Sequence, residues 1–482
     1  MKWRMFICAI CFLIGGCSLN IPLEDQFSDP DAITDVLSAR SLLASAYKAM
    51  PQQIFQLSVL SDDFCPSQHL NKDMSLQGLY NWREVEMTEL AGTLWAGYYA
   101  VIAEVNALLA RIDAVVTLDE TEKLEKMRIV CEAKALKSWC YFDLLRLFAP
   151  HVGSKPNAQG IPYVTIYEVA VSPFKTVSEV YDLVIKDLKE AELLLQEDET
   201  LLVYPRKFVL NDGFATCREI HFNLYAAQAL LARVYWMKGD LENALIYAKK
   251  VIDSGKFPLE DKLNIRSFMA GTITEKEAVW GVYTTQILDN VKKNFYTYDM
   301  TYTWLPADDN TALYSVAQED GNDMRGNDWF RILIGEEESD RIVRCMKIVN
   351  ETKISNPGAY TSKSIEGINM IRIPEMYLIA AEALLESDPD EAQKYFDTFI
   401  VSRGLFKYKD RPGSPQVTLE DIVKERRKEF VQEGQYFYTL KRGNMDIYVD
   451  ALKTTLQGTD ELYTFIIPDE EFEYRYTEAD EQ

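Results

Sequence analysis

The sequence is poor in histidine and lacks the short motifs on which common enzyme classes depend. Its 482 residues include three histidines, far apart in the chain, at His69, His151 and His221. It contains no H-E-x-x-H, no G-x-S-x-G and no glycine-rich phosphate loop. In common zinc hydrolases, serine hydrolases and nucleotide-binding enzymes, these patterns place a metal, a nucleophile or a phosphate. We therefore expect no catalytic activity, no metal and no cofactor.

Positive charge is scarce as well. The chain carries 51 Lys and Arg against 75 Asp and Glu, a formal net charge of −24. Its few basic runs, such as residues 424–428, are interleaved with acids. A protein that binds nucleic acid needs a basic face, because binding depends on replacing counterions along the polymer. The composition therefore argues against a nucleic-acid partner.

Long apolar runs are absent except at the N-terminus. Lys2 and Arg4 lead into an uncharged apolar run over residues 5–14, and residues 14–17 read I-G-G-C. The run is far shorter than the roughly 20 residues that a membrane-spanning helix needs. A cationic start, a short apolar run and small residues before a cysteine are typical of a lipoprotein signal.

This signal predicts how the mature chain begins. We expect a signal peptide over residues 1–16, lipidation of Cys17 and a polar tether over residues 17–31; an ordinary signal peptide cut nearby is the alternative. Residues 1–16 contain Lys2 and Arg4 and no acidic residue, so their removal lowers the net charge by two, from −24 to −26. We expect no later run long enough to span a membrane, and therefore a soluble body held to the membrane by its lipid alone.

The cysteines do not form a disulfide framework. Cys8 and Cys11 leave with the signal, so their C-x-x-C spacing is a false redox motif. Apart from Cys17, an odd number remains, without paired spacings: Cys65, Cys131, Cys140, Cys217 and Cys345. Of these, Cys131 and Cys140 lie on one predicted helix, too far apart to bridge each other. We expect most of them to be small buried apolar residues.

Helical periodicity dominates much of the chain. Apolar residues recur at spacings of three and four, which predicts helices over residues 32–49, 95–112, 122–148 and 176–195. Pro150 ends the third helix, and Ser178 is placed to cap the fourth. Trp95 and Trp139 lie on helical faces, so we assign both to the core.

One sequence pattern occurs twice. Residues 226–231 read A-A-Q-A-L-L, and residues 380–385 read A-A-E-A-L-L. Each copy is followed by a turn and a second predicted helix, over 241–252 and 390–401. Small residues let antiparallel helices approach closely, which is typical of tetratricopeptide-type hairpins. The copies are about 150 residues apart, so this is no simple tandem array, and two unrelated alanine-rich helices are the alternative.

Residues 257–370 differ in character from these helices. The helical period fades, and Gly, Asn, Asp, Thr and Tyr dominate. Long irregular insertions on a helical scaffold commonly carry binding residues. A last helix is predicted over about residues 419–442, where we expect Glu425, Glu429 and Glu433 to form a structural ion network beside Arg426.

Two acidic pairs deserve a separate interpretation, Asp62-Asp63 and Asp308-Asp309. Two carboxylates can act together in a glycosidase, but a chain this acidic offers many such pairs by chance. The segment Asp308-Asp309-Asn310 offers oxygen ligands for calcium but lacks the EF-hand pattern, so a solvated loop is the better interpretation.

Seven segments, in this order, resemble the SusD/RagB family of outer-membrane nutrient-uptake lipoproteins. They are the lipobox; W-x-x-Y-Y-x-x-I-x-x-x-N from Trp95; Ala135 followed by Y-F-D-L-L-R-L-F from Tyr141; T-V-S-E-V-Y from Thr176 with Asp187-Leu188; residues 226–235; I-R-I-P-E-M-Y-L-I-A-A-E-A from Ile371; and E-R-R-K-E-F from Glu425 with Glu433-Gly434. The resemblance covers most of the mature chain. Residues 436–442 depart from the family pattern, which puts one local ion pair in doubt.

The resemblance implies a mostly α fold and a single domain over residues 32–482. In that fold about four tetratricopeptide-like hairpins support an irregular, loop-rich region, here at about residues 257–370. It also implies a non-catalytic protein that captures a nutrient glycan, or in some members a peptide, and delivers it to a SusC-like TonB-dependent transporter. Such a protein is lipid-anchored on the outer membrane and faces the exterior. A helical-repeat adaptor that binds only protein is the alternative from another class.

A sugar site needs aromatic platforms for the apolar faces of the rings and polar side chains for the hydroxyls. Residues of these types gather in two stretches of the sequence. The candidates are Tyr80, Trp82 and Arg83 in the first, and Tyr296, Tyr298, Tyr302, Trp304, Arg325 and Trp329 in the second. For each aromatic residue, burial in the core is the competing interpretation. The candidates rest on composition and location, since no family motif transfers them.

Overall fold

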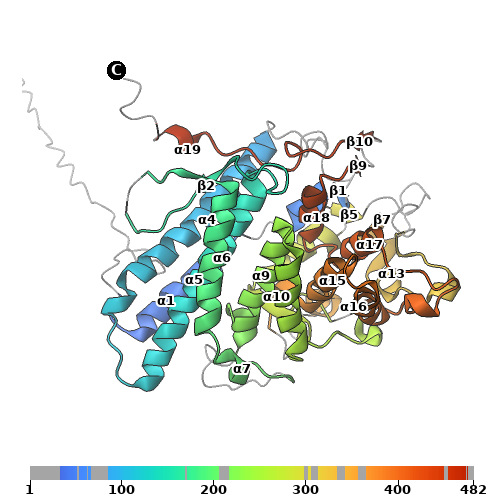
Figure 1. Ribbon diagram of the computed structural model, residues 1–482, viewed down its shortest axis with the longest axis horizontal. Helices are drawn as coiled ribbons and strands as arrows, with labels where there is room; N and C mark the ends of the chain where they lie inside the picture. The colour runs from blue at the N-terminus through green and yellow to red at the C-terminus, as the bar shows by residue number, and fades with distance from the viewer. Residues whose placement is uncertain are drawn as a thin grey trace, which may run out of the picture.

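The fold is mostly helical, as expected (Figure 1). The computed structural model describes residues 33–51, 54–61, 63–66, 85–168, 171–205, 217–266, 268–297, 302–304, 313–333, 342–356, 365–449, 454–473 and 475. The signal peptide, Cys17 and the tether lie outside these residues and stay predictions. Cys131, Cys140 and Cys345 are buried free thiols, and Cys217 is half-buried.

The elements alternate long helices with short strands. The helices are α1 (Val36–Lys48), α2 (Ile54–Leu60), α4 (Val85–Arg111), α5 (Glu120–Phe148), α6 (Val177–Leu194), α7 (Asp198–Leu201), α9 (Leu224–Lys238), α10 (Leu241–Asp253), α11 (Ile287–Val291), α13 (Met324–Asp328), α14 (Glu351–Ser355), α15 (Ile373–Leu384), α16 (Pro389–Val401), α17 (Leu419–Glu429), α18 (Gln435–Gly443) and α19 (Glu470–Glu473), with a π-helical turn η5 (Lys292–Tyr296). The strands are β1 (Phe64–Pro66), β2 (Gln159–Pro162), β3 (Phe174–Thr176), β4 (Ala278–Tyr283), β5 (Tyr302–Trp304), β6 (Phe330–Leu333), β7 (Ile342–Cys345), β8 (Gly367–Arg372), β9 (Ile447–Val449) and β10 (Thr454–Leu456).

The long helices form one continuous row, which we call the scaffold. Helix α1 packs on α4, α4 on α5, α5 on α6, α6 on α9, α9 on α10, α10 on α15 and α15 on α16 (Figure 1). The two copies of the alanine pattern lie in α9 and α15, so the pair α9–α10 packs directly on the pair α15–α16. Ala226 and Ala380 are fully buried, as a close approach of helices requires. The helix pairs agree with the expected hairpins, while a tetratricopeptide geometry stays a prediction.

Capping residues set several helix ends. Thr176, not Ser178, caps α6: its hydroxyl accepts the Glu179 N–H, and the Glu179 carboxylate accepts the Thr176 N–H. The single helix expected over residues 419–442 is wrong, because the chain divides there into α17 and α18. Between them Gln432 and Gly434 have φ of 63° and 69°, left-handed values that end a helix.

One further expectation needs correction. Among the described residues, the helix over Met87–Ala114 is long and apolar enough to cross a membrane by length and composition. It packs against α1 and α5, and side chains along it such as Leu94, Tyr98 and Val101 are buried. A core helix passes the same test as a membrane span, and packing in the core accounts for the composition of this one.

The region at residues 257–370 is not irregular throughout. Strands β5, β7 and β6 join β1 in a four-stranded antiparallel sheet of order β1-β5-β7-β6. A second hydrophobic cluster, with Phe64, Phe295 and Trp329 among its buried members, packs at this sheet, apart from the scaffold core. The sheet brings together segments about 240 residues apart in the chain, since β1 pairs with β5.

Candidate functional site

A cavity of about 320 Å³ lies beside the four-stranded sheet. Its wall is formed by the sheet, by α13 and by the segment before α13; the lining residues are Tyr314, Ser315, Val316, Gly321, Asn322, Asp323, Gly326, Asn327, Phe330, Ile332 and Val343. We call this cavity the α13 groove. Its volume lies at the lower end of the roughly 300–1,000 Å³ that small-ligand pockets occupy.

Two glycines hold the segment before α13 in place. Gly321 and Gly404 have φ of 109° and 96°, and a Cβ at Gly404 would lie 2.3 Å from the carbonyl oxygen of Asn322. The Asn322 N–H donates to the Gly404 carbonyl at 3.1 Å. Only glycine tolerates both the left-handed backbone and this contact. This close contact between Asn322 and Gly404 therefore places Asn322 on the wall of the groove.

The wall combines amides with an aromatic surface. Asn322 and Asn327 are exposed, and the Asn327 side-chain amide donates to Oδ1 of Asn322 at 2.9 Å. The Asn322 amide also donates to Sδ of Met324 at 3.5 Å. These bonds leave further donor and acceptor positions on both amides. Phe330 is half-buried, with its ring centroid 5.1 Å from that of the buried Tyr314. Together they provide hydrogen-bonding groups and an apolar ring on one wall.

Asp323 joins the groove to a buried ion network. Its carboxylate accepts from Arg325 and Lys428, each at 2.8 Å. Burial alone would raise the pKa of Asp323, but Arg325 and Lys428 lower it to about 2. The carboxylate is therefore charged at neutral pH and anchors the start of α13 to α17.

Glu429 of α17 is the centre of this network. It accepts from Arg372 at 2.7 Å, from Arg403 at 2.9 Å and from Arg325 at 3.2 Å. These cations hold its pKa well below the usual range, although burial opposes them. The three arginines come from β8, from the turn after α16 and from α13, so one carboxylate fixes three separate segments.

The network includes all three expected glutamates, but not the expected arginine. Glu425 accepts from Arg325 at 2.6 Å, and Glu433 accepts from Arg372 at 2.9 Å. Arg426 lies instead 3.6 Å from Glu375 and over the ring of Trp236. The expected ion network is thus confirmed, and its cations come from distant segments.

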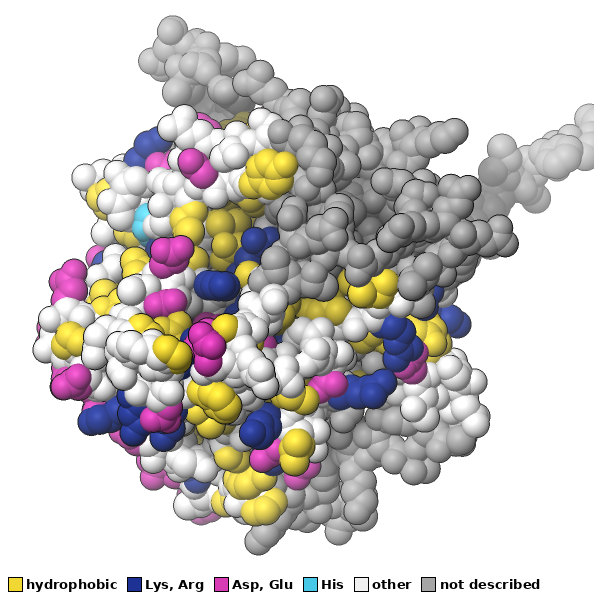
Figure 2. Space-filling model, turned by 90° about the vertical axis from the view of Figure 1, so that its right-hand side faces the viewer, with side chains coloured by type: hydrophobic (Ala, Val, Ile, Leu, Met, Phe, Trp, Pro, Cys, Tyr) yellow, Lys and Arg dark blue, Asp and Glu magenta, His cyan; other side chains and the backbone are white. Residues whose placement is uncertain are grey.

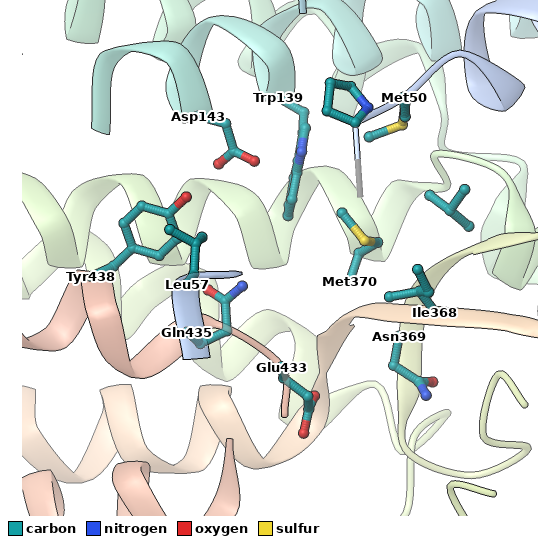
Figure 3. Close-up of a pocket in the computed structure, with 12 residues that line it drawn as sticks. Met50, Leu57, Trp139, Asp143, Ile368, Asn369, Met370, Glu433, Gln435 and Tyr438 are labelled. Atoms are coloured by element: carbon teal, nitrogen blue, oxygen red, sulfur yellow. The ribbon is translucent and has the colours of Figure 1, made fainter. Parts of the chain in front are cut away.

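A smaller cavity of about 20 Å³ lies between α5, α18 and β8 (Figure 3). Trp139, Asp143, Tyr438 and Met370 are among its lining residues. Nε1 of Trp139 is buried there without a hydrogen-bond acceptor. A cavity of this size holds about one water molecule and is too small for a sugar. The α13 groove is therefore the better candidate for a ligand site.

The described part of the face around α13 carries charges of both signs. Figure 2 views the molecule from the side where Figure 1 places α13 and β7. On the described part of this face, basic and acidic side chains are mixed with hydrophobic ones. Within the described residues, no group of His, Cys, Asp and Glu side chains is arranged to hold a metal ion.

Comparison with known families covers nearly the whole chain. A family described as starch-binding and associating with the outer membrane matches residues 23–236, and the SusD family matches residues 236–477. The chain belongs to the SusD/RagB family. The expected membership is therefore confirmed.

Individual SusD-like proteins are distant in sequence but alike in fold. A SusD-like protein of Bacteroides ovatus is 21% identical over 501 residues, which cover 91% of this chain and 82% of that protein. A SusD superfamily protein from Bacteroides thetaiotaomicron has a TM-score of 0.71 at 22% identity, covering 91% of this chain and 98% of the other. A laminarin binding SusD-like protein has a TM-score of 0.67 at 20% identity, covering 91% and 98%. At these identities, the structural likenesses show the fold.

Two of the candidate residues of this SusD-family chain are contradicted by their burial. Arg325 and Trp329 are both fully buried. Arg325 is bound by Asp323 and its partners in the network, and Nε1 of Trp329 donates to the carbonyl of Ile265 at 2.9 Å. Neither side chain can contact a ligand. The sequence showed their types but not the partners that the fold brings to them.

The other candidates are only partly described. Tyr80, Trp82, Arg83 and Tyr298 lie outside the described residues. Tyr302 and Trp304 belong to β5, in register with Pro66 and Phe64 of β1, and only their backbone is described. Tyr296 is half-buried, and its hydroxyl donates to Glu351 at 3.3 Å.

Sequence reasoning missed Asn322, Asn327 and Phe330. They lie in or next to the turn-rich stretch over residues 321–329, but nothing local distinguishes them from other loop residues. Their place on the groove depends on Gly404, about 80 residues further along the chain. The assignments of Trp95 and Trp139 to the core are confirmed, since they are 6% and 1% exposed.

Proposed function

We propose that this protein captures a nutrient glycan at the cell surface and delivers it, chemically unchanged, to a SusC-like TonB-dependent transporter. The observation that carries the proposal is the α13 groove, where the amides of Asn322 and Asn327 lie beside the ring of Phe330. Sugars present hydroxyls and apolar C–H faces, which amides and aromatic rings bind respectively.

The comparisons support a glycan as the ligand. One matching family is described as starch-binding and associating with the outer membrane, and one protein of the same fold is named for laminarin binding. With lipid on Cys17 and a tether over residues 17–31, the body would be held at the outer membrane, facing the exterior. Capture and release need no catalytic group.

In this proposal Trp82 and Trp304 are the stacking platforms, Tyr80, Tyr298 and Tyr302 are further ring contacts, and Arg83 bonds hydroxyls. Strand pairing supports the choice of Trp304, which ends β5. β5 in turn pairs with β7, whose Val343 lines the groove.

Calorimetric titration of residues 18–482 with starch, laminarin and other oligosaccharides, and with a peptide pool, tests the proposal. We expect saccharide binding that weakens about tenfold in Asn327→Ala, the loss of roughly one hydrogen bond, and further in a Trp82→Ala, Trp304→Ala double variant. Asn243→Ala is the matched control, since this amide of α10 also makes one local bond, at 2.8 Å to Asp240. Binding of peptides alone, or turnover of any glycan, would contradict the proposal.

A further inference from the structure

The two faces of the four-stranded sheet differ in chemistry. Phe330 and Ile332 of β6 line the α13 groove. Because side chains alternate along a strand, Arg331 between them lies on the other face. Arg331 is directly opposite Arg344 of β7 in the strand register. Like charges at directly opposed positions repel each other and destabilise a sheet.

One carboxylate, Glu351 at the start of α14, lies among these arginines. It accepts two hydrogen bonds from the Arg331 guanidinium, one of them at 2.7 Å, and one from the Tyr296 hydroxyl. The hydrogen bond from Arg331 lowers the pKa of Glu351, and the charge of Arg266 lowers it further. We call Arg266, Tyr296, Arg331, Arg344 and Glu351 the Arg344 cluster.

Arg344 has no carboxylate partner among the described residues. Its guanidinium lies over the ring of Tyr296, 5.1 Å from the centroid, and its Nε is buried without an acceptor. Burial lowers the pKa of Arg344, with Arg331 adding to this and Tyr296 and Glu351 opposing it, and arginine stays charged at neutral pH. Within the part of the chain that the structure describes, the cluster therefore holds more positive than negative charge.

The ion network of the interior shows the opposite arrangement. Arg325, Arg372 and Arg403 each bind at least two carboxylates. The chain has 75 acidic against 51 basic residues, so carboxylates are not in short supply. Among the described residues, two opposed arginines share one glutamate, and a bound anion would balance them.

We propose that the Arg344 cluster binds the anionic group of an acidic sugar, a carboxylate of a uronic acid or a sulfate ester. A planar guanidinium matches the paired oxygens of either group, and Tyr296 provides a ring beside it for the sugar. The Arg331 side chain is 37% exposed, which leaves the cluster open to a ligand. This inference deepens the proposed function and rests on it, since the ligand is taken to be a glycan.

Calorimetry of residues 18–482 with matched probes tests the site. The probes are a galacturonic acid oligomer, its methyl ester, a sulfated galactan oligomer, a laminarin oligomer and a poly-aspartate peptide. We expect the acid or the sulfate ester, whichever the site takes, to bind at least tenfold more tightly than the methyl ester, with an affinity that falls as salt rises. Arg344→Gln should lose about tenfold of that affinity, and Arg344→Lys should retain part of it.

Three further variants separate recognition from structure. Arg111→Gln is the matched control, since Arg111 also lies over a tyrosine ring, that of Tyr167, at 5.7 Å. Glu351→Gln removes the competing carboxylate and should tighten binding of the anionic probe several-fold, which a merely structural role would not do. Arg331→Gln gives a second test if Arg344→Gln lowers the melting temperature.

Some outcomes would overturn the inference. The inference is wrong if the galacturonic acid oligomer, its methyl ester and the sulfated oligomer bind with equal affinity. It is also wrong if Arg344→Gln and Arg331→Gln both leave binding of the anionic probe unchanged. Binding of poly-aspartate without any acidic sugar would also overturn the inference. If laminarin binds while every acidic sugar fails, this inference is wrong and the proposed function stands. If no saccharide binds, both are wrong.

Discussion

The scaffold differs in its contacts from the four-stranded sheet with α13, which we call the sheet region. The scaffold is joined mainly by apolar packing, with Ala226 and Ala380 fully buried, and one buried ion pair, Arg233 with Glu375, also joins α9 to α15. In the sheet region, buried ion pairs that converge on Glu429 tie α13 to α17, to β8 and to the turn after α16, at the edge of the scaffold. Apolar packing has no direction, whereas bidentate ion pairs fix orientation. Changes in the network should therefore disturb the groove, and changes in the scaffold should affect stability alone.

The largest effect is expected from Glu429→Ala. It leaves Arg325, Arg372 and Arg403 without their shared carboxylate, and removing one partner of a buried ion pair costs about 3–5 kcal/mol. Urea unfolding measures the loss. Glu420→Ala, at an exposed position of the same helix, should cost less than about 1 kcal/mol. Equal effects of the two variants would contradict the comparison.

Asp63, directly before β1, should give the sheet region a pH dependence. Burial raises its pKa to about 6, opposed by Arg427 at 3.3 Å. Because the folded pKa lies above the ordinary value of 3.8, the contribution of this group to stability is fully present below about pH 4 and is lost as pH rises through 6. The pH-dependent contribution of Asp63 to the free energy of unfolding is about 3 kcal/mol at most. The free energy of unfolding at pH 4 minus that at pH 7 should be lower for Asp63→Asn than for the natural chain. An equal value in the two proteins would contradict the assignment.

Gly404→Ala should disturb both stability and binding. The new Cβ would meet the Asn322 carbonyl, and the left-handed backbone adds strain, so we expect a loss of about 2–3 kcal/mol together with weaker saccharide binding. Gly413→Ala has a similar φ, 76°, but its Cβ would meet nothing within 4 Å. If the two variants bind glycan equally well, the contact between Gly404 and Asn322 does not position the groove.

The smallest effect on this scale is expected in the scaffold. Ala380→Leu overpacks the fully buried face of α15 and should cost at least about 1 kcal/mol, with no change in glycan affinity. Ala383→Leu, at a half-buried position of the same helix, should cost less. Thermal unfolding and calorimetry on the same samples check both parts. A loss of affinity in Ala380→Leu would show that the scaffold and the groove are coupled.

The comparison also explains what the sequence could predict. Helix α5 was expected over residues 122–148 and is found at Glu120–Phe148, because helical periodicity is local. The strands of the sheet are three or four residues long, too short for a period to show, and β1 pairs with a strand near residue 303. Arg325 was misassigned for the same reason, since its partner Glu425 is 100 residues away.

The central claim is that a glycan binds to the sheet region and not to the scaffold. Hydrogen–deuterium exchange, with and without the tightest-binding oligosaccharide of the panel, tests it most directly. The account predicts slower exchange in residues 313–333 and 342–345, with the scaffold helices α5, α9 and α15 unchanged. Protection confined to those helices, with residues 313–333 unchanged, would contradict it.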